Sequence, residues 1–311
     1  MCDIGYHGCP IWSSSPAICI LDYFVTPIVY VSTGDNYDIP ASVLSCINRT
    51  HSASCGSPRN FDDSIVLLNF TDGNIIAGHQ FAGNKYQIDA FNLNCNYGLP
   101  CPTLNGTFDP DSDFASGVMV VDTIIRDRSV RMACAGSKNG IFYCLDHLNG
   151  SLIWNTIIGP ISGSVGGIMF GSAYDGQRIY VSQSNGLNIP FKDCNGRNVT
   201  GGSWTALNPS DGSILWCTPE PSSARAYGPL AVSNGVLYSG SLSTIGYSQF
   251  GINTENGEII FQRNTGGSFA TATPYITSTG KAMLLWGNSY GINTNNVYNN
   301  TQVFVYGLPS Y

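Results

Sequence analysis

Residues 109–114, DPDSDF, place three aspartates at alternate positions, the spacing with which a calcium-binding EF-hand loop begins. A complete loop of that kind needs glycine at its sixth position and glutamate at its twelfth. These positions hold Phe114 and Val120, and Pro110 interrupts the run. The stretch is therefore not an EF-hand, although its carboxylates leave a looser calcium site open.

A second short motif, GNSYG at residues 287–291, has the Gly-x-Ser-x-Gly spacing of serine hydrolases. In those enzymes the serine lies on a sharp turn between a strand and a helix. The residues that follow here, INTNNVYNN, do not favour a helix, so the match does not indicate a nucleophile. The four histidines also lack the spacing of a metal site or a catalytic triad; they are His7, His51, His79 and His147.

Eleven cysteines without a Cys-x-x-Cys or His-x-x-x-His motif indicate disulfides in an oxidising compartment rather than a metal site. Short intervals, a hairpin turn and a long insertion each suggest a pairing. The predicted pairs are Cys46 with Cys55, Cys95 with Cys101, Cys134 with Cys144, and Cys194 with Cys217. Buried free thiols are the alternative, and the odd number leaves one cysteine without a partner in the chain.

Composition and charge argue against two classes of partner. Only 11% of the residues are charged, and the net charge is −7 at pH 7. Nucleic acids and anionic membranes attract basic patches, and no run of Lys or Arg is present. The longest apolar stretch, AICILDYFVTPIVYV, contains Asp22 and Pro27 and is too short to span a bilayer. We therefore predict no nucleic-acid partner and no membrane insertion.

Six Asn-x-Ser/Thr sequons agree with secretion. We predict N-linked glycans on exposed loops or turns at Asn48, Asn69, Asn105, Asn149, Asn198 and Asn299. Together with the cysteines, the sequons predict a secreted, extracellular glycoprotein.

One nine-residue pattern recurs and indicates which elements position these residues. DHLNGSLIW at 146–154 is nearly repeated as NPSDGSILW at 208–216, and weaker copies are NFTDGNIIA at 69–77 and NTENGEIIF at 253–261. Each copy contains an Asp-Gly or Asn-Gly pair, which favours the positive φ angles of a tight hairpin turn. A repeated turn between apolar runs predicts a repeated β-hairpin.

Almost no segment favours a helix, so the repeated turn can be taken as the link between the last two strands of a four-stranded module. Five modules result, near residues 15–81, 116–158, 168–219, 228–264 and 271–307, and the last is one strand short. This pattern predicts one all-β domain over 1–311, a β-propeller of four-stranded antiparallel blades. A β-sandwich is the alternative, but it does not explain the repeated turn.

The chain resembles the quinoprotein (PQQ-dependent) alcohol dehydrogenases and their polyvinyl-alcohol-dehydrogenase-like relatives over nearly its whole length. The strings that carry this resemblance are IWSSSPAI, VYVSTGDNY, DSDFASGVMVV, SKNGIFYCLDHLNGSLIW and GGSWTALNPSDGSILW. The family's propeller has eight blades, so the resemblance implies that about five later blades are present and N-terminal blades are missing.

The resemblance also assigns roles to four residues. Trp12 matches the tryptophan that stacks on the quinone, and Asp35 matches a metal-ligating asparagine. Asp113 matches the catalytic base, and Lys138 matches the basic residue that reaches the quinone oxygens. Their types suit these roles, since a carboxylate accepts a proton, an oxygen binds calcium and an aromatic face covers a flat ring. Each residue also has a purely structural interpretation, as a core aromatic, a turn cap, a loop end or a hairpin tip.

Two functions follow from the resemblance and from the part that is missing. The family's acidic calcium ligand and vicinal disulfide belong to the missing blades, which favours a non-catalytic extracellular binding or assembly protein without a cofactor, including a filament-forming one. The alternative is a PQQ- and calcium-dependent dehydrogenase of primary, secondary or polymeric alcohols. In either case another protein segment or identical copies would complete the propeller, because an incomplete one exposes apolar blade faces.

Overall fold

The structure is a computed structural model that describes residues 3–12, 18–22, 25–50, 55–81, 112–163, 165–243, 245–288 and 302–307. Contacts within the chain define two compact units. One comprises Met1–Met169 with Ser210–Gly212, and the other comprises Phe170–Pro209 with Ser213–Tyr311. A single domain over 1–311 therefore stays a prediction.

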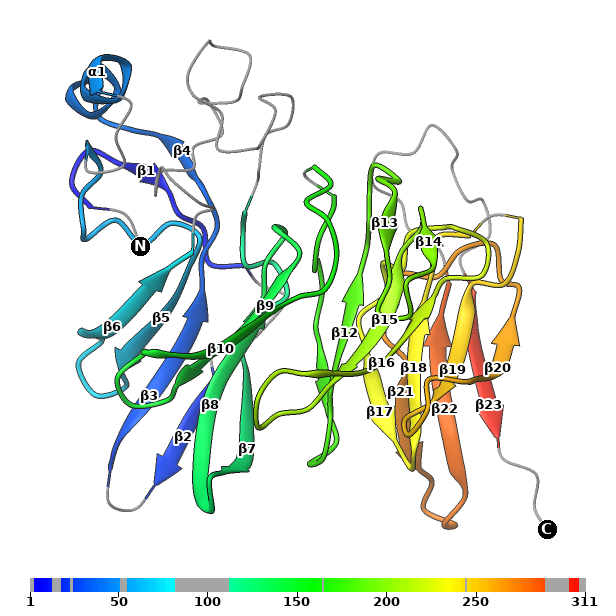
Figure 1. Cartoon of the computed structure of the whole chain (residues 1–311). Helices are drawn as coiled ribbons and strands as arrows, with labels where there is room; N and C mark the ends of the chain where they lie inside the picture. Colours follow the sequence, from blue (N-terminus) through cyan, green and yellow to red (C-terminus); the bar gives the residue numbers. More distant parts are fainter. Residues whose placement is uncertain are drawn as a thin grey trace. The chain divides into compact units, whose positions relative to one another are not determined.

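The first unit contains two four-stranded antiparallel sheets (Figure 1). One has the order β2 (Ile18–Asp22), β3 (Val25–Ser32), β5 (Ser64–Asn69) and β6 (Ile75–Gln80). The other has the order β10 (Leu152–Ile157), β9 (Ile141–Asp146), β8 (Arg128–Gly136) and β7 (Met119–Ile125). A small ribbon joins β1 (His7–Gly8) to β4 (Asn36–Asp38). Both large sheets correspond to predicted modules.

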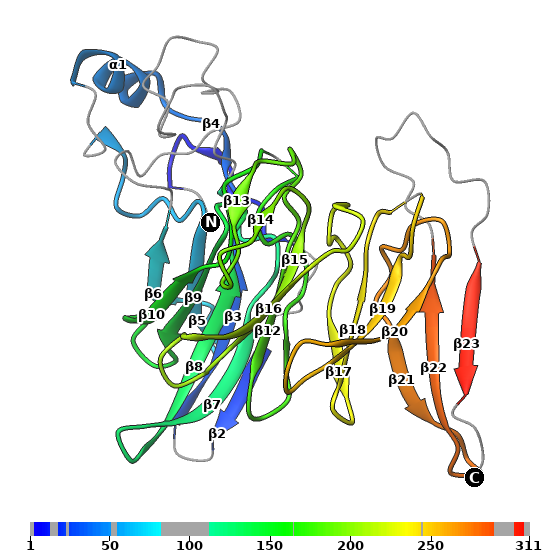
Figure 2. The same cartoon turned by 45° about the vertical axis from the view of Figure 1, so that its right-hand side comes forward.

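The second unit contains three further large antiparallel sheets (Figure 2). The first is β11 (Ala173–Tyr174), β12 (Ile179–Gln183), β15 (Ser203–Leu207) and β16 (Ile214–Pro219). The second is β17 (Ala231–Ser233), β18 (Val236–Gly240), β19 (Gln249–Asn253) and β20 (Ile259–Arg263). The third has three described strands, β21 (Thr273–Ile276), β22 (Ala282–Gly287) and β23 (Val303–Gly307). The predicted all-β fold of four-stranded modules is confirmed.

Apolar cores form where the faces of two sheets meet within a unit. In the first unit, the core is built by Ile28, Tyr30, Ile65 and Leu67 against Ala133, Ala135, Tyr143 and Leu145. In the second, Tyr180, Trp204, Ala206 and Trp216 pack with Leu237, Phe250 and Ile252. Alternating residues of each strand supply these faces, as strand geometry requires.

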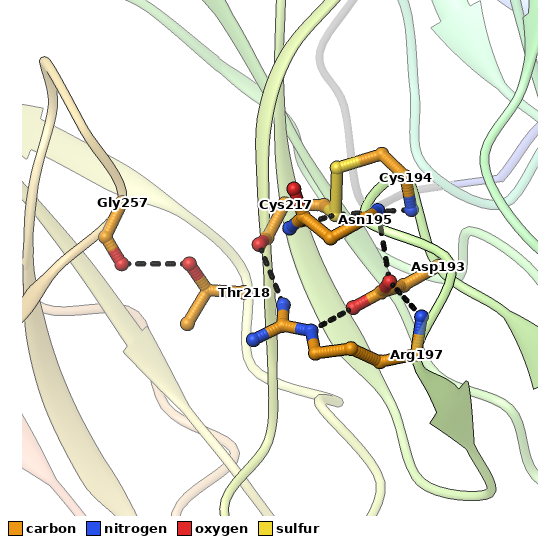
Figure 3. The surroundings of a disulfide bond; sticks show 7 residues. All are labelled: Asp193, Cys194, Asn195, Arg197, Cys217, Thr218 and Gly257. Atoms are coloured by element: carbon orange, nitrogen blue, oxygen red, sulfur yellow. Dashed lines mark hydrogen bonds and ion pairs between the residues drawn. A yellow bond between two sulfur atoms is a disulfide. The ribbon is translucent and has the colours of Figure 1, made fainter.

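The repeated turn has a glycine because the preceding sheet packs against it. Gly257 has a φ of +75°, and a Cβ placed on it would lie 2.7 Å from Cε3 of Trp216. Thr218 donates a hydrogen bond from Oγ1 to the carbonyl oxygen of the same glycine at 2.6 Å (Figure 3). In the same way, Trp154 packs against Gly212, and Oγ1 of Thr156 donates a hydrogen bond to the carbonyl oxygen of Gly212. The glycine is therefore needed both for its backbone angle and for the space that the aromatic ring occupies.

The stretch between β4 and β5 contains a helix that the sequence analysis did not predict. Helix α1 spans Ala41–Thr50, in a chain of which almost no segment favours a helix. The carbonyl oxygen of Pro40 accepts hydrogen bonds from the amides of Val43 and Leu44. Proline at a helix start and Arg49 in the last turn are the local signals that favour it.

Three predicted disulfides lie in the described residues, and all three are formed. They are Cys46–Cys55, Cys134–Cys144 and Cys194–Cys217. Cys134 and Cys144 are directly opposite each other in the pairing of β8 with β9. The predicted pair Cys95–Cys101 lies outside the described residues.

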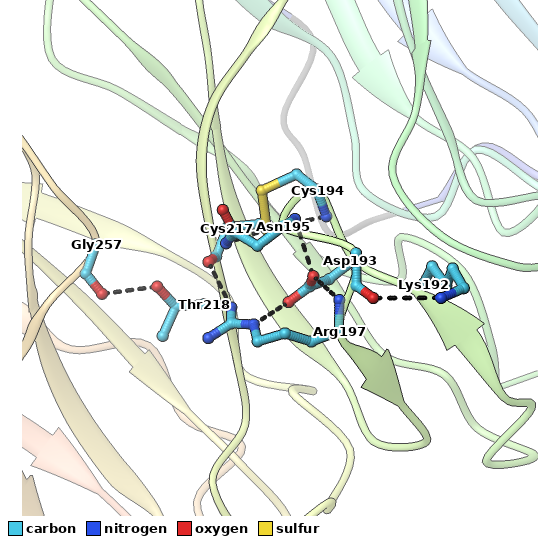
Figure 4. A network of polar contacts seen from close by, with 9 residues as sticks. Lys192, Asp193, Cys194, Asn195, Arg197, Cys217, Thr218 and Gly257 are labelled. Atoms are coloured by element: carbon cyan, nitrogen blue, oxygen red, sulfur yellow. Dashed lines mark hydrogen bonds and ion pairs between the residues drawn. A yellow bond between two sulfur atoms is a disulfide. The ribbon is translucent and has the colours of Figure 1, made fainter.

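A hairpin inserted between β12 and β15 is tied to β16 by the last of these disulfides. It contains β13 (Phe191–Lys192) and β14 (Asn198–Val199), with Cys194 in the connecting turn. Asp193 and Arg197 form an ion pair at 2.7 Å beside the disulfide, and the Lys192 ammonium donates to the carbonyl of Gly196 at 3.4 Å (Figure 4). The insertion thus has its own polar network in addition to the covalent bond.

The described part of the chain has no helix long and apolar enough to cross a membrane.

Candidate active site

The structure brings Trp12, Asp35, Asp113 and Lys138 together in the first unit. Trp12 follows the bridge of Ile11 with Thr33, and Asp35 directly precedes β4. Asp113 lies in the segment before β7, and Lys138 lies in the turn between β8 and β9. Four segments that are distant in the sequence therefore converge on one place.

Asp113 and Lys138 form a buried ion pair. Nζ of Lys138 lies 2.6 Å from Oδ2 of Asp113, and each side chain is 5% exposed. The backbone amide of Lys138 also donates to the carbonyl oxygen of Asp113 at 2.9 Å. Because a buried charge is costly without a partner, these two residues depend on each other.

The second oxygen of the Asp113 carboxylate is bound by the segment that contains Asp35. Its Oδ1 accepts a hydrogen bond from the backbone N–H of Asp35 at 2.6 Å. A Cβ on the neighbouring Gly34 would overlap Asp113 Oδ1 and would lie 2.7 Å from Nε1 of Trp12. Glycine at this position is what allows the carboxylate and the indole to approach the backbone this closely.

Trp12 completes the group through its ring. The Lys138 ammonium lies 4.8 Å from the ring centroid, a distance typical of a cation–π contact. Nε1 of Trp12 is buried and has no hydrogen-bond partner among the described residues. The ring thus provides an aromatic face and a buried donor beside the ion pair.

The turn that contains Lys138 is held by hydrogen bonds on both sides. Ile168 donates its backbone amide to the carbonyl of Ser137 at 3.1 Å. Asn139 donates from Nδ2 to the hydroxyl oxygen of Tyr143 at 3.0 Å. Burial raises the pKa of Tyr143 to about 12, so its phenol stays protonated around neutral pH.

Asp62 is a residue near this site that the sequence analysis missed. It is fully buried, and its carboxylate accepts hydrogen bonds from Nδ2 of Asn36 at 2.8 Å, from Nδ2 of Asn60 at 2.9 Å and from Nε2 of Gln80. Asn36 directly follows Asp35, so this network anchors the segment that binds Asp113. No local spacing pattern in the sequence indicates it, because Asn36 and Gln80 come from segments that are distant from Asp62 in the sequence.

The described residues fit a flat quinone better than they fit a metal. A ring face, an ammonium and a buried indole N–H lie next to one another, and these groups suit the flat face and the oxygens of a quinone. In the described part of the chain, no group of three or more His, Cys, Asp or Glu side chains could hold a metal ion. Asp113, the described aspartate of the DPDSDF stretch, is engaged by Lys138. A calcium cage is therefore not built by these residues.

The sequons lie in several kinds of structure. Asn149 and Asn198 are exposed, and Asn69 is half-buried at the end of β5. Asn48 lies in α1 and Asn198 in β14, so the prediction that all sequons lie on loops or turns is wrong for Asn48, Asn69 and Asn198. The reason is that Asn69 ends β5 just before the repeated turn, and that α1 and the short strand β14 form at the other two positions. Asn105 and Asn299 lie outside the described residues.

Comparison with known proteins supports the fold. No protein-family model matches the chain. A polyvinylalcohol dehydrogenase from a Pseudomonas species is 28% identical over 230 residues, which cover 70% of this chain and 32% of that protein. The structure of a quinohemoprotein alcohol dehydrogenase from Comamonas testosteroni matches 97% of this chain and 48% of that chain, with a TM-score of 0.67 and 15% identity. A second quinohemoprotein alcohol dehydrogenase, from Pseudomonas putida, matches 88% of this chain and 44% of that one, with a TM-score of 0.58 and 13% identity.

These matches agree with the predicted resemblance and with the predicted blades. The chain spans 32% of the curated relative and 48% of the Comamonas structure, so it corresponds to part of such a protein. Its four-stranded sheets are the blades of the shared architecture. The chain shares the β-propeller fold of the quinohemoprotein alcohol dehydrogenases and resembles a polyvinylalcohol dehydrogenase in sequence, and it spans part of the length of these proteins.

Proposed function

We propose that this chain provides the base-bearing part of a quinone-dependent alcohol oxidation site. The observation that carries the proposal is the buried pair of Asp113 and Lys138, with the Lys138 ammonium over the ring of Trp12. The names of the relatives support it, since they are alcohol and polyvinylalcohol dehydrogenases. The alternative of the sequence analysis, an oxidoreductase, thus becomes the preferred function.

In this proposal each side chain has a definite task. A bound quinone such as PQQ would supply the hydride acceptor. The Asp113 carboxylate would hold the proton released from the alcohol hydroxyl, as a general base does. Lys138 compensates the carboxylate charge where water is excluded and contacts the ring of Trp12, against which a flat group would stack. We assign no step to calcium, because the described residues do not form a cage for it.

The test is turnover of primary, secondary and polymeric alcohols by the purified chain with added PQQ and an artificial electron acceptor. We expect Asp113→Asn to lower turnover by about a hundredfold or more, as loss of a general base does. The matched control is Asp122→Asn, which removes an exposed ion pair with Arg131 elsewhere on the same blade. Equal loss in both variants, or full activity of Asp113→Asn, would contradict the proposal.

A second candidate is the non-catalytic binding or assembly protein favoured by the sequence. One observation supports it, since both oxygens of Asp113 already accept hydrogen bonds from the chain itself. In this case the parent protein would show neither turnover nor quenching of its tryptophan fluorescence by PQQ. Quenching that depends on Trp12 would instead support the dehydrogenase.

We also propose that the chain is secreted, N-glycosylated and completed by a further segment or by identical copies. The disulfides support an oxidising compartment, and the span of less than half of the Comamonas relative supports a missing partner. Peptide mass spectrometry before and after glycosidase treatment tests the glycans, with exposed Asn149 and Asn198 expected to be modified. Light scattering tests the partner, because the chain alone has a mass of 33.3 kDa.

A further inference from the structure

A buried carboxylate lies next to the segment that holds the proposed base, and the proposed reaction gives it no task of its own. Asp62 is fully buried. Its Oδ2 accepts a hydrogen bond from Nδ2 of Asn36 at 2.8 Å. Its Oδ1 accepts hydrogen bonds from Nδ2 of Asn60 at 2.9 Å and from Nε2 of Gln80. A carboxylate that accepts at both oxygens can orient the amide groups that donate to it.

The hydrogen bond to Asp62 fixes the direction in which the Asn36 amide points. An amide side chain has a donor end and an acceptor end, whereas an ionised carboxylate only accepts. With Nδ2 of Asn36 turned toward Asp62, Oδ1 of Asn36 lies 3.0 Å from Sγ of Cys9. The backbone amide of Cys9 donates to the carbonyl oxygen of Asp35 at 2.8 Å. Asn36 is thus held between two segments, and it is the residue that follows Asp35.

Two further hydrogen bonds join the segment before β5 to the segment before β4. Oγ1 of Thr33 donates to the carbonyl oxygen of Phe61 at 2.6 Å. The backbone amide of Asp63 donates to the carbonyl oxygen of Gly34 at 3.3 Å. Together with the side-chain contact of Asp62, these bonds support the residues that approach the proposed base.

We propose that Asp62 is a positioning residue for the carboxylate of Asp113. Through Asn36 it fixes the backbone of Asp35, whose N–H donates to Oδ1 of Asp113 at 2.6 Å. The Lys138 ammonium holds the other carboxylate oxygen, so a shift of the Asp35 amide would turn the carboxylate about that contact. A misplacement of about 1 Å can cost about a hundredfold in rate. The effect on catalysis rests on the proposed function, whereas the orientation of the Asp35 amide does not.

The test exchanges the two side chains of the pair. In Asp62→Asn, the new amide oxygen still accepts from Asn60 and Gln80, but the new Nδ2 faces Nδ2 of Asn36, so two donors meet. In Asn36→Asp, two carboxylates meet instead. The double variant restores one donor and one acceptor and keeps an oxygen toward Asn60 and Gln80. It should therefore recover what each single variant loses.

The first measurement is the amide proton resonance of Asp35 in the ¹⁵N-labelled chain, which does not depend on catalysis. The short hydrogen bond to a carboxylate should place this proton downfield, and Asp113→Asn should move it upfield. We expect Asp62→Asn and Asn36→Asp to move the resonance upfield as well. The double variant should return it to the position of the parent.

The second measurement is turnover of the alcohols with PQQ and the artificial electron acceptor. We expect Asp62→Asn to lower kcat about tenfold or more with a nearly unchanged KM for the alcohol, and the double variant to recover most of the loss. Glu220→Gln is the matched control for both measurements. Glu220 is also buried and accepts hydrogen bonds from the amides of Ser222 and Ala224, but it lies in the second unit. Its replacement should leave the Asp35 resonance and the turnover unchanged.

Protection of the β8 and β9 amides from hydrogen exchange reports whether the first unit of each variant is folded. If a single variant does not fold, a folded double variant with the parent's Asp35 resonance is the expected rescue. An unchanged resonance in Asp62→Asn, or a double variant that is unfolded or as impaired as the single variants, would overturn the proposal. A parent chain without turnover would contradict the proposed function instead, and the Asp35 resonance would then decide the positioning role.

Discussion

The hydroxyl of Thr218 donates a hydrogen bond to the carbonyl oxygen of Gly257 at 2.6 Å, while the indole of Trp216 covers the same glycine. The repeated sequence motif is thus an interface between blades as well as a turn. The aromatic residue of each copy contacts the next blade, and the Asn/Asp-Gly pair contacts the previous blade. This explains why the whole nine-residue pattern recurs and not only the turn.

Replacing the turn glycine should therefore lower the free energy of unfolding by more than the strain of the backbone angle alone. Gly257 and Gly280 have φ values of +75° and +78°, but no atom lies within 4 Å of a Cβ built on Gly280. Each alanine substitution should cost about 1–2 kcal/mol for the left-handed backbone. Gly257→Ala should lose about 1–3 kcal/mol more through overlap with Trp216. Urea unfolding measures both variants, and equal losses would contradict the packing argument.

The ion pair of Asp113 and Lys138 should contribute to stability in a way that an exposed pair does not. Asp113→Asn or Lys138→Met leaves one buried charge alone and should cost about 3–5 kcal/mol. The double variant should cost less than the sum of the two, because no unpaired charge remains. Asp122→Asn, in an exposed pair with Arg131, should cost less than about 1 kcal/mol. Additive losses in the double variant would show that the two residues act independently.

The fold could be predicted from the sequence because its signals are local. Alternating apolar residues and Asn/Asp-Gly turns lie within the hairpins, and the strands of the five large sheets fall within the predicted modules. The resemblance to a family also indicated four residues that the structure brings together. Asp62 could not be found in this way, because its donors Asn36 and Gln80 belong to segments that are distant from it in the sequence. Helix α1 was missed because it is short and lies in a stretch rich in loop-forming residues.

The disulfide of Cys194 and Cys217 should keep the inserted hairpin of β13 and β14 in a single conformation. It closes a loop of 23 residues, so replacing both cysteines by serine should cost about 3 kcal/mol. Limited proteolysis should then cut between residues 184 and 202 first. The matched control replaces Cys46 and Cys55, which should expose the chain near α1 instead. Unchanged cleavage of the hairpin would show that its polar network alone is sufficient.

Acid should weaken the same hairpin through Asp193. Burial tends to raise the pKa of Asp193, but hydrogen bonds from the backbone and guanidinium of Arg197 and from the amide of Asn195 outweigh it, so the pKa lies below the usual value. The folded hairpin therefore binds a proton at Asp193 less readily than the unfolded chain, and the stabilisation is fully present above the unfolded pKa of about 4. It is lost as the pH falls through the lower folded pKa. Asp193→Asn should thus be less stable than the parent at pH 7, and the difference in urea midpoint should shrink below pH 4. A difference as large at pH 3 as at pH 7 would show that the charge of Asp193 does not stabilise the hairpin.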